Sequence, residues 1–454
     1  MRHPSRRTAV VLAACVALAG LTYSARDRGT RASVPSTEEA SPLGFGRDPS
    51  IDPTPSRSRA DELERLIRVF EEQVRTAPSA TGFAFLGRLE LERARSTGDG
   101  SSYVRAGTAL EEAVTRAPTD DEAASLLATV RFALHDFSGA FEIADRLSAS
   151  GGGPSALAVR GDASLELGRY REATADYRLL AAELPQSAGA HVRLARLAFL
   201  TGDVGEAVRE ARMAEDLATR DGSFGATRSW YAVFRGRLAL DLGRYGEAAR
   251  HHLRAVRAAP DYHVAVAGLA ASRSAQGRTR EAIALYRRAI RMVPEPSYLG
   301  ALGDLYAAAG RHRLAERRYR TIEAIGALAG AGPSVSDRQR AMFLADHDVR
   351  LRVALRLVRD ELTTRRDVYG WDALAWVLYK LGRLDEARAA AGKALALRTP
   401  DARLWYHAGM ISAALGDGER ARGELIRALT MSPRFDVLQA ERARRQLAAL
   451  GSVP

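Results

Sequence analysis

The chain has 454 residues, of which 46% are hydrophobic and 27% are charged, and its formal net charge is +12. This composition is typical of a folded globular body and excludes an intrinsically disordered chain. The single cysteine, Cys15, excludes a disulfide framework and a cysteine-rich metal site.

The positive charge indicates no nucleic-acid partner. Residues 1–59 hold nine arginines and five acidic residues, and the remaining excess of +8 is expected to be spread thinly over 395 residues. Lysine occurs only at Lys380 and Lys393. A nucleic-acid site would gather its basic residues on one face beside aromatic platforms. We therefore predict a diffuse charge and no nucleic-acid binding.

The N-terminus has the pattern of an export segment. Arginines 2, 6 and 7 precede an apolar run over residues 8–23. A basic stretch followed by an apolar one is typical of a secretory signal or of an N-terminal membrane anchor. We predict such a segment over residues 1–25. The body is then exported or tethered to the cell membrane, outside the cytoplasm, and touches the membrane only through this segment.

Three fates of this segment remain open. It could be cleaved after Ala19, because Ala17-Leu18-Ala19 has the small-x-small form. It could be retained as an anchor. It could also be lipidated at Cys15, because Leu12-Ala13-Ala14-Cys15 resembles the lipobox of bacterial lipoproteins.

A linker and a helix follow. Residues 26–59 are rich in Ser, Thr, Pro, Arg and Gly and have few large apolar side chains, so a disordered linker is predicted. Leu63, Ile67, Phe70 and Val74 then fall at helical spacing, which predicts a leading cap helix over residues 60–79.

A period of about 34 residues governs the rest of the chain. It is clearest at Trp371 and Trp405, where one pattern is written twice. Earlier copies share a turn glycine, at positions 168, 202, 243, 277 and 310. Such a period marks stacked helical hairpins in which each copy touches its neighbours. We predict an all-α right-handed superhelical solenoid of helix-turn-helix repeats.

The predicted array has three parts. Repeats occupy residues 80–329, a degenerate repeat occupies residues 330–367, and two clear repeats occupy residues 368–435. A trailing cap helix and tail follow at residues 436–454. In the degenerate copy, Asp346-His347-Asp348 stands where the others have Leu-Gly.

Small residues and prolines explain how each hairpin packs. Gly161, Gly236 and Gly409 on first helices, with alanines such as Ala248 on second helices, are expected to allow close approach. Prolines at 185, 260, 294 and 433 are expected to end second helices, because proline cannot continue a helix.

These residues resemble the tetratricopeptide repeat, whose pattern combines Trp, Leu-Gly, Tyr, Ala, an aromatic residue and a closing Pro. The resemblance covers about residues 80–435, and the layout resembles exported tetratricopeptide proteins of actinobacterial type. It implies that the concave lining of the first helices binds a peptide or a partner protein. In the last two copies this lining would comprise Tyr369, Asp372, Trp376, Tyr379, Arg403, Tyr406 and Met410.

Two alternatives to this binding surface remain open. Trp376 and Tyr379 could instead pack between helices. The family's basic and asparagine clamp for a C-terminal carboxylate is not recognisable, because Asp372 and Trp376 stand where Lys and Asn are expected. Binding of chaperone-type tails is therefore disfavoured.

We find no motif that predicts catalysis, a cofactor or a metal. His251 and His252 are neighbours on a helix, so their rings point about 100° apart and favour a surface pair over a metal site. Asp346-His347-Asp348 favours a solvated turn over a metal or acid–base site. The sequence thus predicts a non-enzymatic interaction scaffold. The alternatives are an assembly or enzyme-associated module for cell-envelope components, and a cryptic enzyme.

Overall fold

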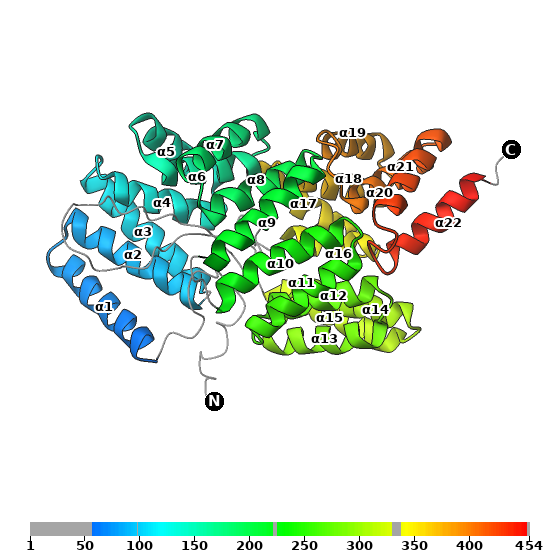
Figure 1. Cartoon of the computed structure of the whole chain (residues 1–454), viewed down its shortest axis with the longest axis horizontal. Coiled ribbons are helices and arrows are strands. Elements are labelled where there is room, and N and C mark those ends of the chain that lie inside the picture. The colour runs from blue at the N-terminus through cyan, green and yellow to red at the C-terminus, as the bar shows by residue number, and fades with distance from the viewer. Residues whose placement is uncertain (1–56, 98, 221–224, 329–336, 452–454) are drawn as a thin grey trace, which may run out of the picture. The chain divides into compact units, whose positions relative to one another are not determined.

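The computed structural model describes residues 57–97, 99–220, 225–328 and 337–451. Within these ranges every regular element is a helix, which confirms the all-α solenoid (Figure 1). The predicted export segment, Cys15 and nearly all of the predicted linker lie outside the described residues. Among the helices described, none combines the length and apolarity that a membrane crossing requires.

The first nine helices in chain order are α1 (Arg57–Thr76), α2 (Ala80–Thr97), α3 (Gly100–Arg116), α4 (Asp121–Ala133), α5 (Phe137–Ala149), α6 (Gly153–Glu166), α7 (Tyr170–Glu183), α8 (Ala188–Leu200) and α9 (Val204–Arg220). The next seven are α10 (Gly225–Asp241), α11 (Tyr245–Ala258), α12 (His263–Ala275), α13 (Thr279–Met292), α14 (Pro296–Ala308), α15 (His312–Leu328) and α16 (Asp337–Asp346). The last six are α17 (Leu351–Thr364), α18 (Val368–Lys380), α19 (Leu384–Ala394), α20 (Ala402–Ala414), α21 (Gly418–Met431) and α22 (Gln439–Gly451).

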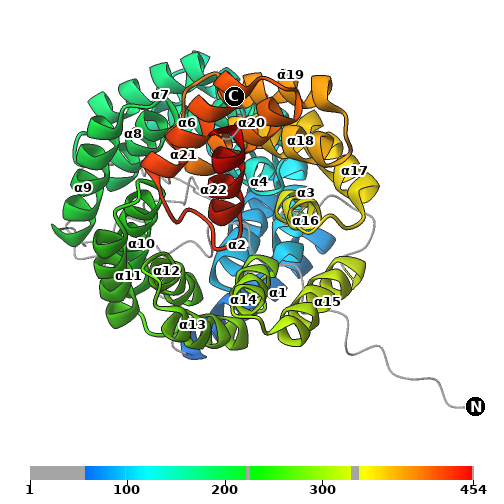
Figure 2. The same cartoon turned by 90° about the vertical axis from the view of Figure 1, so that its right-hand side faces the viewer.

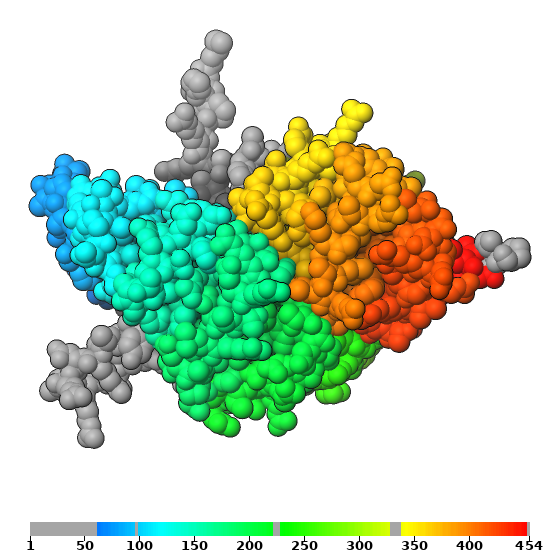
Figure 3. Space-filling model, turned by 90° about the horizontal axis from the view of Figure 1, so that it is seen from above, coloured from blue at the N-terminus to red at the C-terminus, as the bar shows by residue number. Residues whose placement is uncertain are grey.

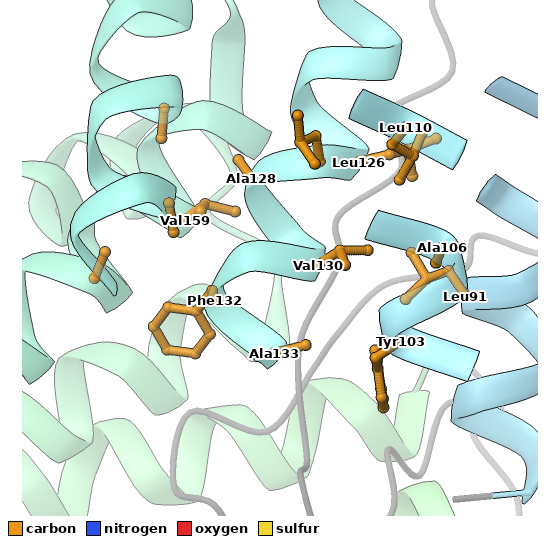
Figure 4. Packing of buried hydrophobic residues seen from close by; sticks show 14 of the residues in the cluster. Leu91, Tyr103, Ala106, Leu110, Leu126, Ala128, Val130, Phe132, Ala133 and Val159 are labelled. Atoms are coloured by element: carbon orange, nitrogen blue, oxygen red, sulfur yellow. The ribbon is translucent and has the colours of Figure 1, made fainter. Parts of the chain in front are cut away.

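The chain divides into two compact units. Unit 1 comprises the described residues of Met1–Arg193 and Arg220–Thr227, and unit 2 comprises those of Leu194–Thr219 and Arg228–Pro454. Each unit is a stack of helical hairpins with its own buried clusters. In unit 1, Leu110, Val130 and Phe132 are buried together between α3, α4 and α6 (Figure 4).

Turns between paired helices use a left-handed residue. All five predicted turn glycines have φ between 71° and 87°, and so do Gly382 and Gly416. Two turns do without glycine: His135 follows α4 with φ 64°, and Asp348 follows α16 with φ 57°. Aspartate tolerates this region better than most residues. The degenerate copy therefore forms two helices, α16 and α17, without the glycine of its neighbours.

The predicted proline stops are confirmed. Helices α7, α11, α13 and α21 end two residues before Pro185, Pro260, Pro294 and Pro433 respectively. The residue before a proline disfavours the helical conformation, so the last helical residue stands two positions before the proline.

First-helix glycines leave room for a large side chain on the second helix. A Cβ placed on Gly161 would lie 2.6 Å from the Tyr177 ring, and one on Gly409 would lie 2.7 Å from Leu425 Cγ. Tyr177 and Leu425 are both fully buried. The expected close approach is therefore confirmed. Gly87 in α2 shows the same close approach, because a Cβ placed there would lie 2.5 Å from Leu110 Cγ on α3.

The prediction of a surface histidine pair is wrong. His251 and His252 are 7% and 1% exposed. The His252 ring fills the space left by Gly236 and Gly268, and its Nδ1 lies 2.8 Å from Ser272 Oγ. Burial lowers the pKa of His252 to about 3, so this imidazole is neutral. The burial of His252 could have been predicted from Gly236 and Gly268, which flank its ring from α10 and α12.

The solenoid of unit 2 closes on itself. Thr399 Oγ1 donates a 2.6 Å hydrogen bond to the Leu200 carbonyl, 199 residues away. Tyr245 OH lies 3.0 Å from Ser432 Oγ and accepts a 2.7 Å hydrogen bond from the Arg434 amide. We call these contacts the seam of unit 2. In Figure 2 the helices of unit 2 wind from one side of the seam to the other.

Replacing Thr399 by valine tests the seam. Thr399 is fully buried, so the isosteric change leaves the Leu200 carbonyl without its hydrogen-bond donor. We expect a loss of about 1–3 kcal/mol in the free energy of unfolding, measured by urea denaturation. Thr430→Val, at an exposed position of α21, is the control and should change stability by less than about 0.5 kcal/mol. Equal effects of both changes would contradict a stabilising seam.

The prediction of a diffuse basic charge is also wrong. Residues 244–366 contain 23 arginines and 12 acidic residues, a net charge of +11, whereas residues 60–243 carry −6. The basic segment spans α11 to α17, all in unit 2. An average taken over the whole repeat array concealed this concentration.

Candidate protein-binding surface

Helices α18 and α20 carry all seven residues predicted to contact a partner. Each helix begins at an aspartate cap, because Asp367 accepts a 2.7 Å hydrogen bond from Gly370 N and Asp401 a 2.9 Å bond from Arg403 N. The caps fix where each helix starts, and therefore which residues face the inner side of the solenoid of unit 2 (Figure 2).

The cap of α18 is held by an ion-pair network. Both Arg338 and Arg365 contact the Asp367 carboxylate, at 2.9 Å and 3.2 Å, and Glu361 joins them. Burial alone would raise the pKa of Asp367. The two guanidinium groups and the Gly370 amide outweigh burial and lower this pKa to about 2.

This network predicts acid sensitivity. The folded pKa of Asp367 lies below the unfolded value, so its stabilisation is present above about pH 4 and is lost as the pH falls towards 2. We expect on the order of 2 kcal/mol to disappear over that interval. Denaturation of the wild type and of Asp367→Asn at several pH values would show it, because the variant should lack this part of the pH dependence. Parallel pH profiles would contradict the assignment.

Four of the seven predicted residues are accessible and three are buried. Tyr369, Tyr379 and Met410 are half-buried, and the Arg403 side chain is 45% exposed. The other three, Asp372, Trp376 and Tyr406, are 5%, 1% and 0% exposed. For Trp376, packing between helices is thus the alternative that the structure favours.

Trp376 is the centre of an aromatic stack. Its ring stacks on His407 at 4.2 Å and on Tyr379 at 4.9 Å between centroids. His407 Nδ1 lies 2.8 Å from Asp372 Oδ1, and both residues are buried. His407 Nε2 has no hydrogen-bond partner within the described residues. The hydrogen bond with Asp372 orients the His407 ring against Trp376.

Asp346 links this stack to the trailing helix. Its Oδ1 accepts hydrogen bonds from Trp376 Nε1 at 2.8 Å and from Gln439 Nε2 at 3.0 Å. Tyr406 OH donates to Gln439 Oε1 at 2.6 Å. Burial raises the pKa of Asp346, although the positive charge of Arg403 opposes this shift. The carboxylate therefore joins α16, α18 and α22.

The expected solvated turn is correct for one residue of three. Asp348 is exposed and pairs with Lys380 at 2.8 Å, whereas Asp346 is engaged as above. His347 Nε2 lies 2.9 Å from Asp304 Oδ1, which also accepts a hydrogen bond from Tyr319 OH. In the part of the chain that the structure describes, no cluster of His, Cys, Asp or Glu is arranged for a metal ion.

Charged residues from α10 complete the surface. Arg237 Nε donates to Asp241 at 2.8 Å, and the negative charges of Asp241 and Asp401 raise the pKa of Arg237. Desolvation raises the pKa of Asp241 to about 6, and Asp401 adds to this shift. These couplings place α10 near α20, 160 residues later. Sequence reasoning missed Arg237 and Asp241 because the 34-residue period relates only neighbouring copies.

Arg403 lies close to several of the acidic side chains of this surface. Its guanidinium is 3.7 Å from Asp436 Oδ2, and Asp346 and Asp401 also raise its pKa. Arg403 and Arg237 are exposed, whereas Tyr369 and Asp241 are half-buried, and the four residues form a polar and aromatic surface beside the buried aromatic stack. This arrangement suits binding of a polar peptide, because arginine and tyrosine are common interface anchors.

Comparison with known proteins agrees with the repeat architecture. Three segments, residues 159–221, 267–329 and 373–434, match the model of the tetratricopeptide repeat. Over 185 residues the chain is 32% identical to "Cellulose synthase 2 operon protein C" of Komagataeibacter xylinus, covering 34% of this chain. The chain spans only 14% of the length of that relative.

Several solved structures show partial similarity to this chain. The Cut9–Hcn1 hetero-tetramer of the APC/C matches with a TM-score of 0.33 and 15% identity, over 86% of this chain and 94% of that one. A tetratricopeptide repeat protein from Parabacteroides merdae matches with a TM-score of 0.34 and 18% identity, over 59% and 100%. The human IFIT1 dimer with PPP-AAAA matches with a TM-score of 0.44 and 13% identity, over 82% and 87%. The match to the tetratricopeptide repeat at residues 159–221, 267–329 and 373–434 thus falls on helical hairpins of an all-α solenoid.

Proposed function

We propose that the protein is a non-enzymatic scaffold that binds a peptide or partner protein on the inner side of unit 2. The observation that carries this proposal is the accessible group of Tyr369, Arg403, Arg237 and Asp241 above the buried Trp376 stack. A rigid buried base lowers the entropic cost of ordering the side chains that contact a partner. The mixed charges favour a polar partner segment over a purely apolar one.

The test compares two double variants of the full chain. Tyr369→Ala with Arg403→Ala removes accessible anchors, and neither side chain is in the core. Ile426→Ala with Arg388→Ala is the matched control, because both residues are exposed on second helices. Affinity capture from a cell-envelope extract should yield proteins that the first variant loses and the control retains. If both variants keep every captured protein, the site is wrong.

We propose further that the array works outside the cytoplasm, exported or tethered by residues 1–25. The supporting observation is the basic and apolar pattern of that segment. Fractionation of cells that express the full chain, beside a Cys15→Ala variant, tests it. Recovery of the wild type in the cytoplasm would contradict export. Loss of membrane retention in the variant alone would assign a lipid anchor, and unchanged retention would exclude lipidation as the required anchor.

A second candidate is an assembly module for cell-envelope components. It is supported by the 32% identity to the cellulose synthase operon protein over 34% of this chain. The same capture experiment separates the two candidates. Capture of a polysaccharide-synthesising enzyme through Tyr369 and Arg403 would favour the assembly module, and capture of other proteins would favour a general scaffold.

A further inference from the structure

The outer helices of unit 2 present arginine side chains in rows. On α13, Arg280, Arg287 and Arg291 stand at i, i+7 and i+11, which places them within about 40° of one line along the helix. On α15, Arg313, Arg317 and Arg320 stand at i, i+4 and i+7, within about 60°. Figure 2 shows α13 and α15 on the outer side of α12 and α14. We call these six residues the arginine face.

The arginine face is not neutralised by the protein. All six side chains belong to exposed residues. Some other exposed arginines of unit 2 do pair within their own helix, as Arg209 does with Glu206 and Arg388 with Asp385. Within the described residues, none of the six guanidinium groups forms such a pair. Glu316 is the acidic residue that shares the exposed side of α15.

The chemistry of the face points to phosphate. Guanidinium groups bind phosphate oxygens with paired hydrogen bonds and remain charged at any physiological pH. Six such groups without internal partners form a site for a multivalent anion, and attraction to it falls with rising salt.

The shape of the arginine face favours a membrane surface over a nucleic-acid strand as its ligand. Strands of nucleic acid are usually held in grooves in which aromatic side chains stack on the bases. The arginine face lies on the outer side of the solenoid, and its rows contain no aromatic residue. Helix α17 (yellow in Figure 3) also carries exposed arginines, at Arg352, Arg356 and Arg359. A broad outward surface matches a layer of headgroups better than a single chain.

We propose that the arginine face binds the surface of a bilayer that contains anionic phospholipids. This contact is separate from any anchoring by residues 1–25 and from the inner binding surface of unit 2. It would hold unit 2 with α13 and α15 against the headgroups.

The experiment measures binding of the full chain to vesicles of phosphatidylcholine alone and of phosphatidylcholine with phosphatidylglycerol. An apolar N-terminal segment contributes to both, so the readout is the increase in affinity that phosphatidylglycerol causes. We expect that increase to fall about a hundredfold or more in the quadruple variant Arg287→Gln, Arg291→Gln, Arg317→Gln and Arg320→Gln, since each surface arginine contributes about fivefold. Glutamine is a good helix former, and circular dichroism verifies the fold.

The matched control removes the same charge elsewhere. Arg209, Arg212, Arg388 and Arg422 are exposed on α9, α19 and α21, and their replacement by glutamine also lowers the net charge by four. The control should keep the phosphatidylglycerol effect nearly intact. Equal losses in both variants would overturn the proposal, because they would show a response to net charge alone. The proposal would also be overturned if phosphatidylglycerol did not increase the affinity of the wild type for vesicles. Binding of oligonucleotides without such an increase would overturn it too.

Discussion

Trp376→Ala is expected to lower the free energy of unfolding of unit 2 by about 3–5 kcal/mol. The indole is 1% exposed, so its removal leaves a cavity between α16, α18 and α20. It also deprives Asp346 of a hydrogen-bond donor and His407 of its stacking partner. Both the lost packing and the lost hydrogen bond to Asp346 lower the stability.

Trp371→Ala is the control for that experiment. Trp371 lies on the same helix but is only partly buried, and its ring contacts the Lys393 ammonium at 3.9 Å. Loss of this contact should cost about 1 kcal/mol. Urea denaturation followed by far-UV circular dichroism compares the two variants. Similar midpoints would show that Trp376 does not hold the C-terminal hairpins together.

The combination of Gly236→Ala and Gly268→Ala should be the second most damaging change. Each new Cβ would lie 2.5–2.6 Å from the His252 ring, one from α10 and the other from α12. The ring is buried and its Nδ1 is held by Ser272, so it cannot move aside. We expect each change to cost about 1–3 kcal/mol through overpacking, with thermal unfolding as the measurement.

A double-mutant cycle checks the cause. In a His252→Ala background, which lacks the ring, Gly268→Ala should cost much less than in the wild type. The coupling energy then reports the clash itself and excludes a general effect of alanine on α12. Additive effects would show that the glycine serves some purpose other than making room for the histidine.

The repeat period made the local architecture predictable. Turn glycines such as Gly243 and stops such as Pro260 act within one hairpin, and their physical effects do not depend on distant residues. The small first-helix residues that allow close approach, such as Gly161, were also predicted from spacing, but their partner side chains, such as Tyr177, were not. The prediction of an all-α solenoid and of its turn glycines from Gly168 to Gly310 was therefore correct.

The candidate site was predicted less well because its geometry depends on how the helices of unit 2 wind around the solenoid. Position within α18 indicated that Trp376 and Tyr379 share a side, but it did not show that His407 and Asp346 enclose the indole. Contacts such as Thr399 with Leu200 relate residues 199 positions apart, which no 34-residue pattern encodes. The burial of His252 was missed because Gly236 was interpreted only as a site of helix–helix contact and Gly268 was not considered.

The seam fixes the number of repeats in unit 2. In an open solenoid a hairpin can be inserted or deleted at the cost of one interface, since each copy meets only its neighbours. Here a hairpin added between Tyr245 and Thr399 would shift the register of Tyr245 against Ser432 and of Leu200 against Thr399. Both sides of the seam would then lose their partners together. We therefore expect unit 2 to behave as a closed ring with a fixed number of repeats. Under mechanical load it should first resist as one body, and its hairpins should unfold one by one only after the seam breaks.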